Sequence, residues 1–248
     1  MVHGKTTTIK SILNIINSDG EIKIFGKDIK KSEKDVKEQI GVVLDDSFLS
    51  EYLTAKNVNI VMKDIYENWS EEKFKGYLKT FNLPDNKMMK DFSSGMKMKL
   101  KIATAMAHNP KILILDEPTS GLDPVVRNEI LDIFRSYIEE DETRSILIST
   151  HITSDLEHIA DYIILIDNGS IVFYKETGEI LENYGIVKTS KEEFEKFDTS
   201  EYISYKKGKY QYEVLVKNKE KFRSKYRNSV IDKPNIEDIM LFYLKGDK

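Results

Sequence analysis

The residues with the clearest chemical pattern stand near the start of the chain, ahead of an apolar-spaced segment: Gly4, Lys5, Thr6 and Thr7. Glycine, lysine and threonine in this order are typical of the second half of a phosphate-binding loop that runs into a helix. The amide N–H groups of residues 4–7 would point at anionic oxygens from the helix N-terminus. Lys5 would pair with the β- and γ-phosphates of a nucleotide, and the Thr6 hydroxyl would be offered to Mg²⁺.

Two acids farther along the chain add to this pattern. Residues 112–115 form a continuous apolar run, as expected of a strand that is buried on both faces of a parallel sheet. Asp116 and Glu117 follow it directly, and a carboxylate at the end of such a strand can hold Mg²⁺ beside a triphosphate. An acidic turn would explain one of these acids but not the whole neighbourhood. The two groups of residues together predict a site for a nucleoside triphosphate and Mg²⁺.

Apolar periodicity predicts the elements that must position these residues. A second apolar run at 146–150 and a helical spacing over 125–138 predict a right-handed β-α-β crossover from the strand at 112–115. The other expected elements are a helix over 6–17, a strand over 21–25, and a hairpin of 162–167 and 170–174 with a type I′ turn at Asn168-Gly169.

The middle and the end of the chain have different residue patterns. Residues 46–108 follow a helical pattern, in which Ser70 is a candidate N-cap and Phe74, Leu78 and Phe81 share one face. This pattern predicts a helical insert. After residue 186 the sequence predicts two short helices and a second hairpin, with strands at 202–205 and 209–216 and a turn at 206–208.

Composition excludes several classes of protein. The 248 residues include no cysteine, which excludes disulfide frameworks and cysteine-based metal sites. The longest apolar runs are far shorter than the roughly 18 to 20 residues that span a bilayer. The net charge of −4 gives no reason to expect a nucleic acid as a partner. We therefore expect a soluble protein of a reducing compartment.

The order of four short motifs resembles that of ATP-binding cassette (ABC) transporter ATPases. The chain has GKTT at 4–7, FSSGMKMKL from Phe92, ILILDEPTSGLDP from Ile112, and STH ending at His151. The resemblance covers residues 4 to about 180, and the DEPTSGLDP block is its most specific part. The tail PNIEDIMLFYL also resembles the C-terminal helix of exporter-type subunits.

The resemblance implies roles for the acids and for the histidine. Asp116 is similar to the family's magnesium ligand, and Glu117 to the carboxylate that polarises the attacking water. His151 resembles the switch histidine that contacts the γ-phosphate. Asp45 stands where the family usually has a glutamine that reaches the metal, and its carboxylate oxygen would suit Mg²⁺ at least as well.

Other positions resemble residues that act at a dimer seam. Ser93, Ser94 and Gly95 occupy signature positions that cap ATP held by the opposite subunit, although Ser94 replaces the usual first glycine. Asp123 resembles the D-loop acid at the same seam. Because Pro124 follows Asp123, the pair is equally typical of a helix start, with the acid as N-cap and the proline at the first helical position.

The expected fold is α/β: a P-loop NTPase of the ABC nucleotide-binding type that lacks its N-terminal strands, with a helical insert and a small α+β C-terminal extension. The expected domains are an ATPase domain at 1–185, whose helical subdomain covers 46–108, and a C-terminal accessory region at 186–248. Only three residues precede Gly4. The family's first strands, its adenine-stacking aromatic residue and half of its phosphate loop therefore have no counterpart, and the chain resembles a truncated member.

The resemblance implies the ATP-binding and ATP-hydrolysing subunit of an ABC transporter of exporter type, with ATP and Mg²⁺ as cofactors. Transmembrane permease subunits and a second ATPase subunit, identical or different, are the expected partners. These partners would place the chain in the cytoplasm, peripherally on the inner face of the plasma membrane. The alternative is a truncated, catalytically silent fragment or a regulatory nucleotide-binding protein.

Overall fold

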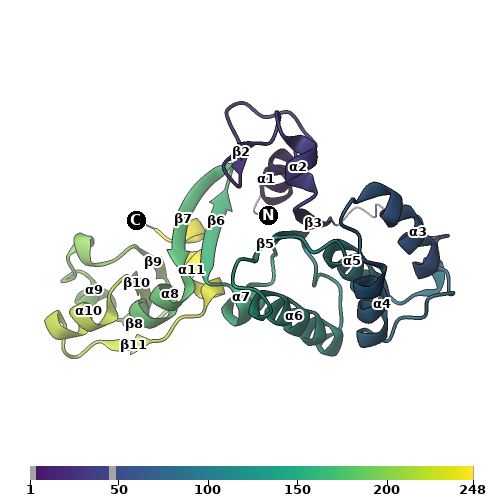
Figure 1. The fold of residues 1–248 in the computed structure, drawn as a ribbon. Helices are drawn as coiled ribbons and strands as arrows, with labels where there is room; N and C mark the ends of the chain where they lie inside the picture. The colour runs from purple at the N-terminus through teal and green to yellow at the C-terminus, as the bar shows by residue number, and fades with distance from the viewer. Residues whose placement is uncertain (1–3, 45–48, 248) are drawn as a thin grey trace. The chain divides into compact units, whose positions relative to one another are not determined.

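The computed structural model describes residues 4–44 and 49–247, drawn as a ribbon in Figure 1. The described chain divides into two compact units, one of residues 5–152 and one of residues 153–247 together with Gly4. Within these described ranges, no helix is long and apolar enough to cross a bilayer. Each unit has its own sheet and core.

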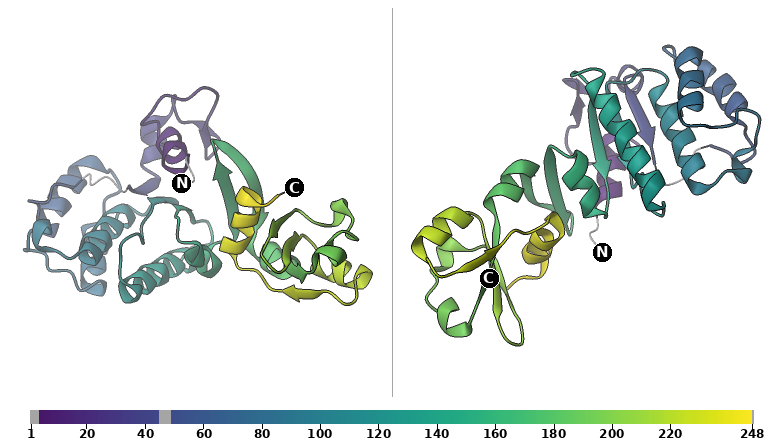
Figure 2. Two further views of the ribbon diagram at one scale, coloured as in Figure 1. Left: turned by 180° about the vertical axis from the view of Figure 1, so that it is seen from behind. Right: turned by 90° about the horizontal axis from the view of Figure 1, so that it is seen from below.

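The unit of residues 5–152 is built on a parallel sheet with the order β3 (Ile40–Val43), β4 (Ile112–Asp116) and β5 (Ser145–Ser149). The helix α6 (Pro124–Glu139) connects β4 to β5 and contacts β5 (Figures 1 and 2). The register of the sheet sets Asp116 beside Ser149. The two strands and the helical crossover predicted from the apolar runs are confirmed. Of the two strands, only β4 is buried as predicted. In the sheet as described, β5 is an edge strand, and Leu147 on it is 36% exposed.

Helices cover both faces of this sheet, because side chains along a strand point alternately to opposite sides. On one face, Ile114 packs in a core with Ile9 of α1 (Lys5–Ile12) and Val36 of α2 (Glu33–Lys37). On the other face, β3 contacts α5 (Ser94–Met106). A Cβ atom on Gly41 would lie 2.3 Å from the carbonyl oxygen of Ala105, so the glycine lets β3 and α5 approach closely.

The helical insert contains α3 (Ala55–Ile65), α4 (Glu71–Thr80), the 3₁₀ turn η1 (Met89–Asp91) and α5. The Ser70 side chain accepts a hydrogen bond from the Lys73 N–H, which confirms the predicted N-cap of α4. Phe74, Leu78 and Phe81 are all buried, as their shared face predicts. In α5, every residue from Leu100 to Met106 is buried.

Two elements near the start of the chain are shorter than predicted. The helix predicted over 6–17 ends at Ile12, and Asn14 has a φ of +55°, a left-handed conformation that asparagine tolerates and that ends a helix. The strand predicted over 21–25 is a tight hairpin of β1 (Lys23–Ile24) and β2 (Lys27–Asp28). Phe25 and Gly26, with φ of +53° and +74°, form its turn.

The second unit begins with α7 (Thr153–Ile159) and an antiparallel hairpin of β6 (Tyr162–Asp167) and β7 (Ser170–Glu176). Asn168 and Gly169 both have positive φ, at +46° and +76°, as the predicted type I′ turn requires. This hairpin and its turn are confirmed. Helix α8 (Thr177–Asn183) follows and contacts β7.

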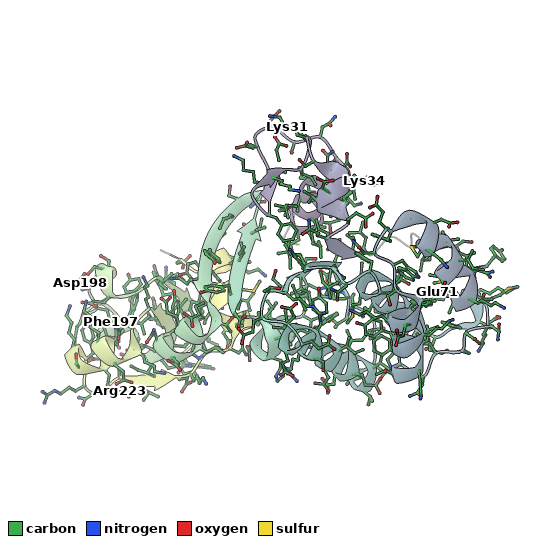
Figure 3. The ribbon with its side chains drawn as sticks, in the orientation of Figure 1. Lys31, Lys34, Glu71, Phe197, Asp198 and Arg223 are labelled. Carbon is green, nitrogen blue, oxygen red and sulfur yellow. The ribbon has the colours of Figure 1, made fainter. Side chains whose placement is uncertain are left out.

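A four-stranded antiparallel sheet forms the rest of this unit, in the order β11 (Val230–Asp232), β8 (Gly185–Thr189), β10 (Tyr212–Val216) and β9 (Ser204–Lys207). Its helices are α9 (Lys191–Phe194), η2 (Thr199–Glu201), α10 (Lys219–Lys225) and α11 (Ile236–Lys245). One core contains Leu215 and Phe242, and another contains Val214 and Phe197. Figure 3 labels Phe197 and the exposed Arg223 of α10.

The second predicted hairpin is present, but its turn lies later than expected. The Gly208 N–H donates to the carbonyl oxygen of Gln211, so residues 208–211 form the turn in place of 206–208. The compact units also divide after residue 152, whereas the sequence predicted a domain boundary at 185. The reason is that Leu165 and Phe173 of the hairpin share a core with Leu215 and Phe242. A functional boundary at 185 stays a prediction.

Candidate functional site

Asp116 is the last residue of β4 and is nearly inaccessible, with 2% of its surface exposed. Because β5 pairs with β4 in register, Ser149 lies beside it, and the Ser149 hydroxyl donates a hydrogen bond to Asp116 Oδ1. A buried polar group needs a hydrogen-bond partner of this kind. Asp116 is therefore held at the carboxyl end of the parallel strands, where ligands of open α/β sheets bind.

Glu117, the next residue, is reached from two other segments. The Lys5 Nζ lies 2.8 Å from Glu117 Oε1, and the His151 Nδ1 lies 2.6 Å from Glu117 Oε2. The His151 backbone N–H also donates to Oε2, at 3.2 Å. Three of the residues singled out in the sequence therefore meet at one carboxylate.

The backbone at Glu117 has an unusual conformation. Its φ of +51° lies in the left-handed region that residues other than glycine rarely adopt. The Glu117 N–H donates to the Ser149 carbonyl oxygen at 2.9 Å, which ties this turn to the end of β5. Uncommon backbone geometry held in place by its surroundings is frequent at functional sites.

The electrostatics of the group favour an ionised Glu117. Burial of the carboxyl group acts to raise its pKa, but the hydrogen bond and positive charge of Lys5 and the hydrogen bonds from His151 act to lower it. The net result is a Glu117 pKa below its ordinary value. Glu117 is therefore an anion at neutral pH and can accept hydrogen bonds but cannot donate one.

The start of α1 provides the expected anion-binding groups. Lys5 opens the helix, Thr6 and Thr7 are exposed in its first turn, and the N–H groups of a first turn have no partner within the helix. Gly4 has a φ of +124°, a conformation that suits glycine. A phosphate would meet N–H groups and the positive end of the helix dipole here.

The donor atoms at this end of the sheet fit Mg²⁺. The Asp116 carboxylate and the Thr6 hydroxyl both offer oxygen, the atom that this hard cation prefers. In the part of the chain that the structure describes, no three His, Asp or Glu side chains gather as a metal cage. Such a site suits a cation that takes one or two protein ligands and the oxygens of a phosphate. Asp45, the other predicted ligand, lies outside the described residues.

The predicted signature residues begin α5. The Ser93 hydroxyl caps the helix by accepting from the Met96 N–H at 3.2 Å, and Ser94 is its first helical residue. Ser93 and Ser94 are exposed. Gly95 is buried, and a Cβ atom on it would lie 2.7 Å from a methyl carbon of Val126. Gly95 therefore has a packing role, because it lets α5 approach α6.

Asp123 has the structural role that its proline neighbour suggested. Its Oδ1 accepts from the N–H groups of Val125 and Val126, each at 3.1 Å, and Pro124 opens α6. Helix capping is thus confirmed, and a role at a dimer seam stays a prediction. Ser93 and Asp123 make these bonds within their own helix starts, and not with the group around Glu117.

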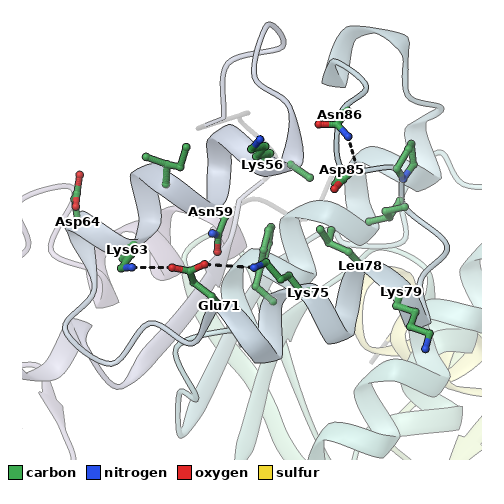
Figure 4. A pocket seen from close by; sticks show the side chains of 15 residues that line it. Lys56, Asn59, Lys63, Asp64, Glu71, Lys75, Leu78, Lys79, Asp85 and Asn86 are labelled. Carbon is green, nitrogen blue, oxygen red and sulfur yellow. Dashed lines mark hydrogen bonds and ion pairs between the residues drawn. The ribbon is translucent and has the colours of Figure 1, made fainter.

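A cavity of about 950 Å³ lies away from these residues, between α3 and α4 of the helical insert. Figure 4 shows Lys63 and Lys75 reaching Glu71 across it, with Leu78 on its wall. None of the predicted site residues that the structure describes lines this cavity. Its size alone does not identify it as the nucleotide site.

The structure adds one residue that the sequence reasoning missed. Ser149 was placed on a strand and within a motif, but its hydrogen bond to Asp116 was not foreseen. The signal was available, since two parallel strands that end in polar residues bring those residues together when the register pairs them.

Comparisons with known proteins extend over most of the chain. The family profile described as ABC transporter matches residues 3–120. The lantibiotic transport ATP-binding protein SrtF of Streptococcus pyogenes is 36% identical over 70% of this chain and 74% of that protein. The daunorubicin/doxorubicin resistance ATP-binding protein DrrA of Streptomyces peucetius is 32% identical over 73% of this chain. The bacitracin transport ATP-binding protein BcrA of Bacillus licheniformis is 34% identical over 68% of it. This chain spans 56% of the length of DrrA and of BcrA.

Solved structures give the same picture of the fold. A structure described as an ATP binding subunit of an ABC transporter matches with a TM-score of 0.63 and 28% identity, over 71% of this chain and 75% of that one. A dimeric ATP-binding cassette bound to ADP and Pi matches with a TM-score of 0.61 over 70% of this chain and 81% of that one. At 23% identity, the second match concerns the fold alone. These similarities confirm the predicted fold class.

Proposed function

We propose that this chain, which belongs to the ABC transporter family of ATP-binding proteins, binds ATP with Mg²⁺ and hydrolyses it to drive an exporter. The observation that carries the proposal is the contact of the Glu117 carboxylate with both Lys5 and His151. Each of these residues belongs to a different motif of the sequence. Their convergence on one carboxylate supports a single site for the γ-phosphate and the water that attacks it.

In this proposal Glu117 polarises the attacking water. Its ionised carboxylate accepts a hydrogen bond from that water, while the backbone N–H of His151 holds Oε2 in place. The other oxygen, Oε1, pairs with Lys5 in the structure. Oε1 becomes able to accept from water when Lys5 turns to a bound phosphate. A positioned base of this kind contributes about 10²- to 10⁴-fold to a rate.

The nucleotide itself would be held by the start of α1. Lys5 and the N–H groups of the first turn bind the phosphates, and the Thr6 hydroxyl and the Asp116 carboxylate are the ligands proposed for Mg²⁺. When bound, Mg²⁺ neutralises charge on the β- and γ-phosphate oxygens. Asp45 is proposed as a further ligand, directly or through a water molecule.

The exporter and its other subunits form the second part of the proposal. Ser93, Ser94 and Gly95 would cap ATP held by a second ATPase subunit, identical or different, with Asp123 at the same seam. Exposure of both serines at the start of α5 supports this role. The names of DrrA, BcrA and SrtF refer to drug resistance and to transport of bacitracin and a lantibiotic. By analogy, this chain would work with transmembrane permease subunits on the inner face of the plasma membrane.

A nucleotide-binding experiment with two lysine variants tests the first part. Lys5→Gln removes the charge proposed to hold the phosphates, and Lys37→Gln removes a lysine that pairs with Glu33 at 2.5 Å on α2. A hydrogen bond to a charged group is worth about 1.5 to 3 kcal/mol. Titration calorimetry with Mg-ATP should therefore show roughly 10- to 100-fold weaker affinity for Lys5→Gln and no change for Lys37→Gln.

Two outcomes of this titration would contradict the proposal. Equal affinity of the parent and Lys5→Gln for Mg-ATP would remove α1 from the nucleotide site. A similar loss in Lys37→Gln would mean that general electrostatics, and not the site, governs binding.

A further inference from the structure

We infer that Ser149 is a positioning residue for the metal-binding carboxylate, an inference that rests on the proposed role of Asp116. Ser149 ends β5, and its hydroxyl donates to Asp116 Oδ1 across the sheet. Both residues are buried, with 8% and 2% of their surfaces exposed. No other described residue donates a hydrogen bond to this carboxylate.

The two oxygens of the Asp116 carboxylate have different surroundings. Oδ1 is engaged by Ser149, so Oδ2 is the oxygen that remains for a cation. A carboxylate that can rotate would present either oxygen, or both, in changing directions. Mg²⁺ demands near-ideal octahedral directions from its ligands. A hydroxyl that fixes the carboxylate plane therefore preorganises a single-oxygen ligand.

The backbone around Ser149 keeps this arrangement rigid. Asp116 and Ser149 are paired residues of neighbouring parallel strands. The Ser149 carbonyl oxygen accepts from the Glu117 N–H at 2.9 Å. One residue therefore orients the carboxylate with its side chain and holds the start of the following turn with its backbone.

Substitutions at Ser149 separate the hydroxyl from the backbone. Ser149→Ala removes the donor and keeps the strand, and Ser149→Thr keeps the hydroxyl on a β-branched residue that suits a strand. Ser145→Ala is the matched control, since Ser145 begins the same strand and is exposed. Asp116→Asn reports on the proposed metal ligand itself.

The probe is Mn²⁺, followed by electron paramagnetic resonance, with the full chain and excess AMP-PNP. Loss of a group that orients a metal ligand weakens metal affinity about 10- to 100-fold. Ser149→Ala should show a loss of this size, and Ser149→Thr and Ser145→Ala should bind Mn²⁺ like the parent. Affinity for AMP-PNP in EDTA should be unchanged by Ser149→Ala, because the nucleotide is held mainly by α1. A general structural defect would weaken binding in EDTA as well, and that result would overturn the inference.

The remaining outcomes distinguish this inference from the function on which it rests. If Asp116→Asn weakens Mn²⁺ binding and Ser149→Ala does not, the positioning role is wrong and the metal ligand stands. If Asp116→Asn also binds Mn²⁺ like the parent, Asp116 is not the ligand and both fail. If the parent binds no Mn²⁺ with AMP-PNP, the proposed function of the chain is wrong, and the role of Ser149 that rests on it is wrong as well.

Discussion

His108 should make the unit of residues 5–152 sensitive to mild acid. The side chain is 1% exposed at the end of the helical insert, and its ring stacks on Tyr66 with centroids 4.0 Å apart. Its Nε2 lies 3.1 Å from the Ile40 carbonyl oxygen, so Nε2 carries the proton and donates. Nδ1 is buried and has no partner among the described residues. A second proton there would be a buried charge with no acceptor.

The magnitude follows from the pKa of this imidazole. Burial lowers the pKa of His108 to about 4, from the ordinary value of 6.5, and the hydrogen bond to Ile40 opposes this shift. As the pH decreases, His108 therefore becomes protonated near pH 6.5 in the unfolded chain but only near pH 4 in the folded chain. Stability is full above pH 6.5 and falls as the pH decreases toward 4. With 1.36 kcal/mol per pKa unit, about 2 kcal/mol is lost by pH 5.

The assay is urea unfolding at pH 8, 6 and 5, followed by the fluorescence of Trp69, the single tryptophan. Trp69 lies 6.5 Å from Tyr66 between ring centroids, so it reports on the same cluster. His108→Gln keeps an N–H donor for Ile40 but does not titrate. We expect the parent to lose about 2 kcal/mol more than this variant between pH 8 and pH 5. Equal losses in the two proteins would refute the reasoning.

Three further predictions concern the packing and capping of the same unit. Gly41→Ala should destabilise the fold by at least about 1 to 3 kcal/mol, because its Cβ would lie 2.3 Å from a backbone carbonyl oxygen. A Cβ atom on Gly76, in α4, would meet nothing within 4 Å, so Gly76→Ala should instead stabilise the fold by about 1 kcal/mol. If the unfolding midpoints of both variants shifted in the same direction, this pair of predictions would be wrong. Asp123→Ala should lower stability by about 1 kcal/mol, because two N–H groups of α6 lose their acceptor. An unchanged unfolding midpoint would mean that water replaces the cap.

Much of the first unit could be predicted from residue patterns, because burial on both faces leaves a clear mark in a sequence. The apolar run of β4 is such a mark. The apolar run of β5 also predicted a strand, although β5 is an edge strand with Leu147 exposed, and the apolar spacing of α6 predicted the helix. Local rules also worked where a side chain accepts a hydrogen bond from a backbone N–H two or three residues later, as at Ser70 and Asp123. Apolar runs, helical spacing and helix caps all involve residues that are close in sequence, so the sequence alone can reveal them.

The errors arose where distant contacts or backbone conformations decide. The periodic spacing continued past Ile12, but a left-handed Asn14 ends the helix there. The turn at 208–211 moved because the Gly208 N–H bonds to the Gln211 carbonyl oxygen. The Ser149 hydroxyl finds Asp116 only through the register of two strands that are far apart in sequence. Lys5 and Glu117 were expected in one site from their motifs, and His151 was added only by resemblance. The structure supplies the distances among the three.

The measurement that tests the proposed function most directly is phosphate release from Mg-ATP by the parent chain and by Glu117→Gln. Glu33→Gln is the matched control, because it removes an exposed carboxylate that also pairs with a lysine. We expect Glu117→Gln to lower turnover by about 10²- to 10⁴-fold while Mg-ATP affinity persists, and Glu33→Gln to match the parent. A parent that binds Mg-ATP without releasing phosphate would support the regulatory alternative. Equal turnover of the parent and Glu117→Gln would contradict the role proposed for the Glu117 carboxylate.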